Sequence, residues 1–166
     1  MREHDTLTWD GTVIRIFIAP EAGAPMQAVE AVRAVPGRGL EGDRYFEARG
    51  SFSRWPGPHR DITLIAEEAL AAMTRETGAV LTPEASRRNV LVRGVPLNDL
   101  IKKTFVVGPV QMEGLRLCQP CKYLARLSGE PAVLPGLIKR GGLRARIVNE
   151  GVIRVGDRVR PVFEEG

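Results

Sequence analysis

Cys118 and Cys121 are the two cysteines of the chain, and together they form a single C-x-x-C motif. Thiolates attack electrophiles, exchange disulfides and bind soft metals, so chemistry is expected first at this pair. The chain shows no apolar leader and is expected in the cytoplasm, where a structural disulfide would not persist. The motif is therefore a candidate nucleophile, redox pair or metal half-site.

The residues around the motif favour Cys121 as the reactive sulfur. A strand is expected before the motif and a helix over residues 120–128, with Pro120 as the first helical residue. Cys121 would then lie in the first helical turn, where unpaired N–H groups and the helix dipole stabilise a thiolate. Arg116 and Lys122 would add positive charge nearby.

Other interpretations of the pair remain open. A zinc site would need His4, His59 and carboxylates to complete its ligands. A thioredoxin-like exchanger would use Cys118 and Cys121 together, but little sheet-and-helix pattern follows the motif in the chain. A single reactive cysteine in a basic pocket and an inert pair of small buried residues are the remaining alternatives.

The net charge of the chain is +4, and its two halves differ in sign. Residues 1–82 contain 9 Lys/Arg against 12 Asp/Glu, and residues 83–166 contain 15 against 8. A basic half predicts a small anionic ligand, or else only a solvated basic surface. Aromatic residues are 5% of the chain and no basic run is interleaved with them, so nucleic acid is not the expected partner. No apolar run is long enough to predict a membrane span.

The 166 residues are expected to form one domain with its core over about residues 10–162. Residues 26–35 are ambiguous, because valines recur at every third position while the length suits a strand. Strands are predicted over residues 7–18, 62–65, 89–93, 104–107, 110–117, 143–148 and 158–163, and helices over 66–77 and 120–128. Consecutive strands with few helices between them predict a mainly β, barrel-like and mostly antiparallel fold with helices at its ends.

Six motifs occur along the chain in one order. They are G-x-G-L-E-G-D-R (37–44), Arg60 shortly before I-T-L-I-A-E-E-A-L (62–70), R-R-N-V-L-V-R-G (87–94), V-G-P-V (107–110), C-Q-P-C-K-Y-L (118–124) and G-V-I-R-V-G-D-R-V (151–159). This order resembles the MOSC domain, which is the C-terminal domain of molybdenum cofactor sulfurase and also occurs as small stand-alone proteins. The resemblance covers roughly residues 10–162.

The resemblance implies a barrel-like MOSC-type fold that binds a molybdenum cofactor or handles sulfur for a metal centre. In the family an invariant cysteine carries the sulfur or ligates the molybdenum, and by motif position it matches Cys121. Cys118 looks like an additional cysteine of some members. The Arg88-Asn89 step and the G-D-R element that ends at Arg44 match further elements of the family.

A molybdopterin-type cofactor would bring a phosphate dianion to the basic half of the chain. The side chains expected to bind that phosphate are Arg88, Arg116, Lys122 and Arg144, and Arg44 is a further candidate cofactor ligand. The amide of Asn89 is a candidate to read a pterin edge. The other interpretation is a solvated charge for each arginine and a loop ion pair for Asp43 with Arg44.

Residues 50–60 are expected to form a loop in which Trp55 and His59 are candidates for a lid. The chain has no room for a pyridoxal-phosphate desulfurase half, so that cofactor is not expected, and a cysteine desulfurase or a molybdoenzyme is a candidate partner. The activity would be sulfurtransferase-like or dependent on the molybdenum cofactor. Two alternatives stay open: a thiol-disulfide oxidoreductase using Cys118 and Cys121, and a non-enzymatic binding module for a phosphorylated ligand.

Overall fold

The computed structural model describes residues 9–46, 61–120 and 122–162. Its strands are β1 (Gly11–Ile18), β2 (Gln27–Val29), β3 (Ala31–Val35), β4 (Gly39–Leu40), β5 (Ile62–Ala66), β6 (Val90–Arg93), β7 (Thr104–Val107), β8 (Val110–Leu117), β9 (Leu143–Ile147), β10 (Gly151–Arg154) and β11 (Arg158–Pro161). Its helices are α2 (Glu67–Thr77), α3 (Pro83–Ser86), α4 (Lys122–Ser128), α5 (Val133–Gly136) and the short 3-10 helix η2 (Leu97–Leu100).

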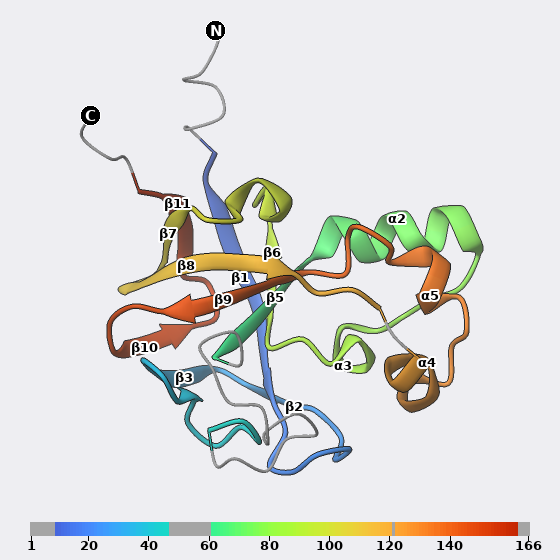
Figure 1. Ribbon diagram of the computed structural model, residues 1–166, viewed down its shortest axis with the longest axis horizontal. Coiled ribbons are helices and arrows are strands. Elements are labelled where there is room, and N and C mark those ends of the chain that lie inside the picture. The colour runs from blue at the N-terminus through green and yellow to red at the C-terminus, as the bar shows by residue number, and fades with distance from the viewer. Residues whose placement is uncertain (1–8, 47–60, 121, 163–166) are drawn as a thin grey trace, which may run out of the picture.

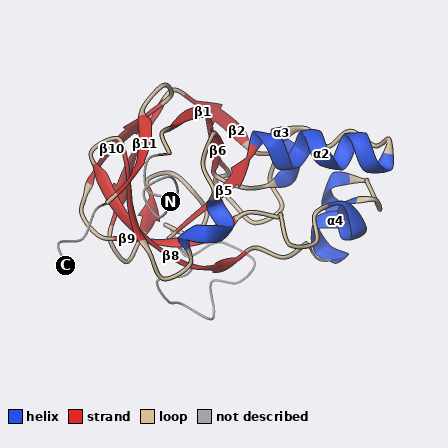
Figure 2. Cartoon of the chain, turned by 90° about the horizontal axis from the view of Figure 1, so that it is seen from above, coloured by secondary structure: helices blue, strands red, loops and turns tan. Residues whose placement is uncertain are grey.

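Seven of the described strands close into a barrel. Their order is β11-β7-β8-β9-β5-β6-β1, and a second pairing between β1 and β11 completes the ring, with β2 added beyond β1. Among the described strand pairs only β5–β6 is parallel. Figures 1 and 2 show α2, α3 and α4 gathered on one side of this barrel. The prediction of a mainly β, mostly antiparallel barrel is therefore confirmed.

A separate three-stranded sheet with the order β10-β3-β4 lies against the barrel. The ambiguous residues 26–35 supply two strands, β2 and β3, which are separated at Glu30. The two-residue strand β4 follows a tight turn in which Gly37 has a φ of +77°, and Gly39 has a φ of +102°. A side chain at Gly39 would place its Cβ 2.8 Å from the carbonyl oxygen of Asp61, so this close approach requires glycine.

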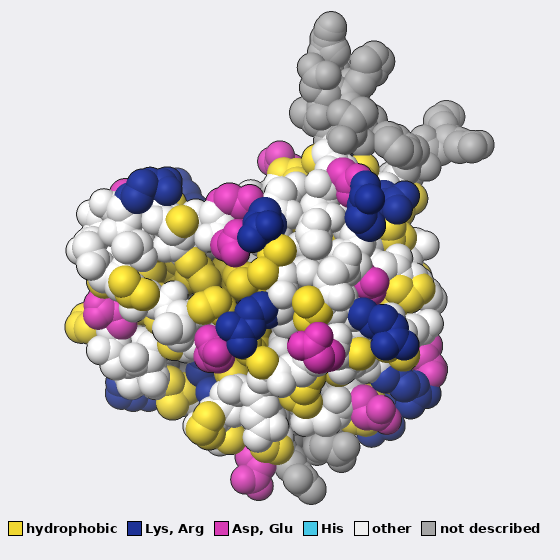
Figure 3. All heavy atoms as spheres, turned by 180° about the vertical axis from the view of Figure 1, so that it is seen from behind, with side chains coloured by type: hydrophobic (Ala, Val, Ile, Leu, Met, Phe, Trp, Pro, Cys, Tyr) yellow, Lys and Arg dark blue, Asp and Glu magenta, His cyan; other side chains and the backbone are white. Residues whose placement is uncertain are grey.

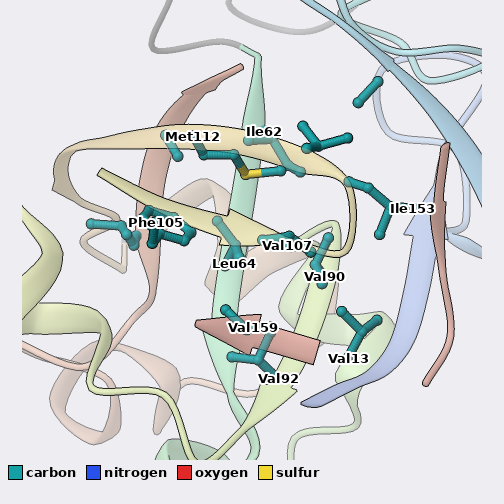
Figure 4. Packing of buried hydrophobic residues seen from close by; sticks show 14 of the residues in the cluster. Val13, Ile62, Leu64, Val90, Val92, Phe105, Val107, Met112, Ile153 and Val159 are labelled. Atoms are coloured by element: carbon teal, nitrogen blue, oxygen red, sulfur yellow. The ribbon is translucent and has the colours of Figure 1, made fainter. Parts of the chain in front are cut away.

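Aliphatic side chains fill the barrel interior (Figure 4). Strand β9 shows how: Leu143, Ala145 and Ile147 are 0% exposed, while Arg144 and Arg146 between them are only half-buried. This is the alternation that the sequence predicts for a strand with one buried face. Each fully buried aliphatic side chain contributes roughly 1.5–3 kcal/mol, so the barrel is a rigid support for the groups on its outer face.

The predicted helix over residues 66–77 is confirmed as α2, which buries Ala69, Leu70 and Met73. Gly78 ends it with a φ of 76° and donates its N–H to the carbonyl oxygen of Thr74. The apolar face of α2 contributes to a second core together with side chains from β1, β6, α4 and α5. The helices on the side of the barrel are thus anchored by their own apolar cluster.

The predicted start of the second helix is wrong. Helix α4 begins at Lys122 and Pro120 is not helical, so Pro120 is not its first residue, and Cys121 lies outside the described residues. The end is as expected, since Gly129 has a φ of +71° and its N–H binds the carbonyl oxygen of Ala125 at 3.0 Å. Proline is favoured at the first position of a helix, and this rule placed the start at Pro120, two residues before the first residue of α4.

Asp61 joins the barrel to the small sheet. Its carboxylate, on a residue 3% exposed, accepts the Ile147 N–H at 3.0 Å and the Gly37 N–H at 3.3 Å. Burial raises the pKa of this carboxyl above its ordinary value, while these two bonds and the charge of Arg146 oppose that rise. The ionised form is therefore disfavoured in the folded state.

We expect Asp61→Ala to lower the free energy of unfolding by about 1–3 kcal/mol, because two backbone N–H groups lose their acceptor. Asp61→Asn keeps an acceptor oxygen and removes the buried charge, so its effect is smaller. Because the folded-state pKa is raised, the native protein loses stability as pH rises above the ordinary carboxyl pKa. In Asp61→Asn, which lacks this titrating group, the free energy of unfolding should fall less over the same pH range. Urea unfolding over an acid-to-neutral pH series measures both effects. If the free energy of unfolding of the parent rose relative to that of Asp61→Asn from acid to neutral pH, the raised pKa would be refuted.

Ion pairs join the two halves of the chain. In three of the described pairs the arginine belongs to the basic half: Arg93 with Glu67, Arg140 with Glu76, and Arg158 with Asp10. In two others the carboxylate belongs to the basic half: Arg15 with Glu84 and Arg33 with Glu150. Figure 3 accordingly shows basic and acidic side chains interspersed over the face opposite to that of Figure 1. None of the helices in the described part of the chain is long and apolar enough to cross a membrane.

Candidate functional site

The candidate site begins where β8 ends and the cysteine motif starts. Cys118 is only 1% exposed, and its backbone N–H donates to the carbonyl oxygen of Gly142 at 2.7 Å. The side-chain oxygen of Gln119, the next residue, accepts the N–H of Lys139 at 3.5 Å. The first half of the motif is thus fixed to a turn formed by residues 139–142, just before β9.

The turn over residues 139–142 approaches its neighbours more closely than side chains would allow. A Cβ at Gly141 would lie 2.3 Å from the carbonyl oxygen of Cys118. A Cβ at Gly142, whose φ is +113°, would lie 2.3 Å from the carbonyl oxygen of Leu64 on β5. Lys139 also has a positive φ, of 65°. The glycine pair therefore lets the turn pack directly against the cysteine segment and the barrel.

Arg88 reaches the same turn from a distant part of the sequence. Its Nε donates to the carbonyl oxygen of Gly141 at 2.8 Å, and its backbone N–H donates to the Ser86 hydroxyl at 3.3 Å. The side chain is half-buried, and its Nη2 atom is buried. Arg88 of the R-R-N motif and Cys118 of the C-Q-P-C motif, which are 30 residues apart, therefore meet at adjacent glycines of one short turn.

Arg116 and Arg144 lie directly opposite each other on β8 and β9. Residues opposite each other in an antiparallel pair point to the same face, which here is the outer face because Leu143 and Ala145 point inward. Within the described ranges neither arginine forms an ion pair with a carboxylate, whereas the adjacent Glu113 and Arg146 bind each other at 3.0 Å. Two unneutralised like charges across a strand pair destabilise the sheet unless an anion lies between them.

Thr63 continues this row onto β5, opposite Arg144. Its hydroxyl donates to the Asn89 side-chain oxygen at 3.1 Å and accepts the Asn89 N–H at 3.0 Å. The row Arg116–Arg144–Thr63 therefore ends beside Asn89. Of the residues that the sequence proposed for anion binding, Arg116 and Arg144 lie in this row, and Asn89, the proposed pterin reader, borders it.

The Asn89 side chain itself is occupied by backbone groups. Its Oδ1 also accepts the Thr63 N–H at 3.1 Å, and its Nδ2 donates to the Phe17 carbonyl oxygen at 3.1 Å. The residue is 4% exposed. These bonds join β1 to β5 at the start of β6, so the structure gives the amide a structural role. Its expected role in reading a pterin edge stays a prediction.

Asp43 and Arg44 form a buried pair beside the end of β1. The Asp43 carboxylate accepts the Ala19 N–H at 2.9 Å and binds Arg44 at 3.0 Å. Arg44 also contacts the Met26 sulfur at 3.6 Å and stacks over Tyr45. This confirms the loop ion pair, and the bonds described for Arg44 do not connect it to the turn over residues 139–142.

Several predicted site residues lie outside what the structure describes. They are Cys121, Trp55, His59 and His4, together with the side chain of Lys122. Among the described residues there is no group of three or more His, Cys, Asp or Glu side chains that could hold a metal ion. The zinc interpretation would need the two histidines, and these fall in the part of the chain that is not described.

Sequence reasoning did not select Thr63, Gln119 or the Gly141-Gly142 pair. The adjacent glycines were a usable signal, since a glycine pair before a strand often marks a close backbone approach. Thr63 and Gln119 carried no such signal, because their partners lie 26 and 20 residues away.

The family model of the MOSC domain matches residues 53–160. The chain belongs to the MOSC domain family. This confirms the resemblance drawn from the six motifs, and the matched range includes the R-R-N motif, the cysteine motif and the Gly141-Gly142 pair. None of the curated protein sequences matches this MOSC domain.

Solved structures share the fold of this MOSC domain. The YUAD protein from Bacillus subtilis aligns with a TM-score of 0.75 and 18% identity over 92% of this chain and 97% of that one. YiiM from Geobacillus stearothermophilus gives 0.69 and 18% over 92% and 75% of the two chains. YiiM from Escherichia coli gives 0.63 and 16% over 92% and 71%. At these identities the likeness establishes the MOSC-type barrel alone.

Proposed function

We propose that this MOSC domain binds a small anionic cofactor of the molybdopterin class beside its cysteine motif, and that Cys121 carries sulfur or ligates the metal there. The observation that carries the proposal is the cross-strand pair Arg116–Arg144 at the end of the strand that leads into the motif, with which no carboxylate of the described residues forms an ion pair. Family membership supports the cofactor class. A reducing cytoplasm, which the sequence favours, would keep both thiols reduced.

The residues present fit a phosphate-bearing pterin. Two guanidinium groups on one face of a rigid sheet can donate several charge-assisted hydrogen bonds to one dianion. Cys118, at 1% exposure, is too buried to meet an external ligand, so the thiol for this role is Cys121. When bound, the cofactor would supply metal-centred redox chemistry, and the chain would supply binding and orientation.

As a sulfur carrier the chain needs no cofactor of its own for loading. The Cys121 thiolate would attack the outer sulfur of a persulfide on a partner such as a cysteine desulfurase. A new S–S bond forms at Cys121, the S–S bond of the donor breaks, and the donor cysteine leaves as a thiolate. Incubation with a desulfurase and cysteine, followed by mass spectrometry, tests this step: the motif peptide should gain the mass of one sulfur atom.

The anion part of the proposal has its own test. We expect the double variant Arg116→Gln/Arg144→Gln to bind inorganic phosphate at least about tenfold more weakly than the parent, because charge-assisted hydrogen bonds contribute about 1.5–3 kcal/mol each. Isothermal titration calorimetry at low salt measures this. Arg154→Gln, which changes an exposed arginine on β10, is the matched control and should leave affinity unchanged. Equal affinities in the parent and the double variant would refute the site.

A further inference from the structure

Arg88 is bonded to the backbone at the point where the cysteine motif is supported. Its Nε lies 2.8 Å from the carbonyl oxygen of Gly141, and a guanidinium N–H donates along a fixed direction in its plane. Binding through Nε fixes the orientation of the whole group. Arg88 is therefore joined to this turn by a directional bond, whereas Arg116 is exposed on the outer face of the sheet.

Gly141 transmits this constraint directly to the motif. The position that its Cβ would take lies 2.3 Å from the Cys118 carbonyl oxygen, so the two backbones are in direct contact. The next residue, Gly142, accepts the Cys118 N–H at 2.7 Å. A shift of the turn would move the peptide groups on both sides of Cys118.

We propose that Arg88 is a positioning residue for the cysteine motif. By holding the Gly141 carbonyl, it fixes the turn against which Cys118 packs, and so holds the first half of the motif in place where β8 ends. It acts as a hydrogen-bond donor to the backbone, which differs from the phosphate-binding role that its charge suggested. The consequence at Cys121 rests on the proposed function, whereas the effect on Cys118 does not.

Two substitutions separate the hydrogen bond from the charge. Arg88→Gln places an amide nitrogen the same number of bonds from Cα as Nε, so it keeps a donor and removes the charge. Arg88→Met has the same length without a donor. We expect Cys118 in Arg88→Met to react with iodoacetamide about tenfold faster than in the parent, the change expected for one lost charge-assisted hydrogen bond, and Arg88→Gln to restore most of the protection.

The readout resolves the two thiols. Trypsin releases residues 117–122 as one peptide, and fragment ions assign the label to Cys118 or Cys121. Arg87→Met is the matched control, because Arg87 also donates to a backbone carbonyl, that of Ala24 at 2.6 Å, away from the turn. Val107→Ala on β7 controls for stability, because it leaves a cavity in the barrel core without touching the turn.

The outcomes decide the inference. Positioning by the hydrogen bond is supported if Cys118 loses its protection from iodoacetamide in Arg88→Met and regains it in Arg88→Gln. Both control variants should keep the protection of the parent. Equal protection in Arg88→Met and the parent overturns it, as does equal loss in Arg88→Met and Arg88→Gln. If Arg88→Met does not fold, Arg88→Lys replaces it: it keeps the charge but moves the donor one bond further from Cα, so it should lose part of the protection of Cys118, and full protection would overturn the inference. Failure of the parent to load sulfur on Cys121 would refute the sulfur-carrier part of the proposed function and leave the Cys118 result standing.

Discussion

Cys121→Ser is expected to abolish sulfur loading of the motif peptide, by at least about a hundredfold, because a serine hydroxyl provides no thiolate near neutral pH. Cys118→Ala is the matched control. The Cys118 thiol is 1% exposed, so its removal should leave loading within about twofold of the parent. Mass spectrometry after incubation with a desulfurase and cysteine measures the sulfur on each variant. Alanine avoids placing an unpaired hydroxyl in the buried position.

The same experiment separates the competing functions. Equal loading of Cys121→Ser and the parent would rule out Cys121 as the carrier. Loss of loading in Cys118→Ala alone would transfer the role to Cys118. A reversible Cys118–Cys121 disulfide with reduction of insulin would favour the oxidoreductase, and two unreactive thiols near neutral pH would favour a binding module with inert cysteines.

The barrel was predictable because its strands have local signatures. Residues 143–148 alternate apolar and basic side chains, and β9 shows that alternation with every second residue fully buried. Helix α2 was equally clear, since its apolar spacing, acidic first turn and Gly78 all agree. Ring closure follows from the pairing of β1 with β11, which no local pattern encodes. The sequence did not assign β2, β3, β4 or β10 as strands: residues 26–35 stayed ambiguous, and β4 has only two residues.

Local rules failed where tertiary contacts decide. Valines at every third position made residues 26–35 ambiguous, although the chain there forms two strands that pair with different partners, β2 with β1 and β3 with β10. Pro120 fits a helix start, but α4 begins at Lys122. In both cases the sequence permitted two local structures, and packing against distant strands or the helix cluster selected one.

The candidate site was predictable in its chemistry and not in its connections. The sequence placed Arg88, Arg116 and Arg144 together as basic side chains near the motif. It did not show that Arg116 and Arg144 are cross-strand neighbours, while Arg88 binds the Gly141 carbonyl. That distinction depends on the register of β8 with β9 and on a turn 53 residues from Arg88. Register is fixed by the whole barrel, so no single motif contains it.

Asn89→Ala is expected to produce the largest loss of stability, about 3 kcal/mol, because the Thr63 N–H and the Phe17 carbonyl lose their hydrogen-bond partner together. Urea unfolding at neutral pH measures this loss. The neighbouring Arg88→Gln keeps a donor toward its own acceptor and should cost less, so it serves as a local control.

Asn89→Asp tests the same arrangement through pH. The carboxylate retains an acceptor for Thr63 but sets a second oxygen against the Phe17 carbonyl, which repels it. The protonated form can donate to that carbonyl, so the variant should recover stability relative to the parent as the pH falls. If Asn89 only read a ligand, Asn89→Ala would weaken ligand binding and leave the free energy of unfolding unchanged. Asn89→Asp would then show no pH dependence of stability of its own. Since its Oδ1 already accepts two hydrogen bonds and its Nδ2 donates a third, we expect the stability effect to dominate.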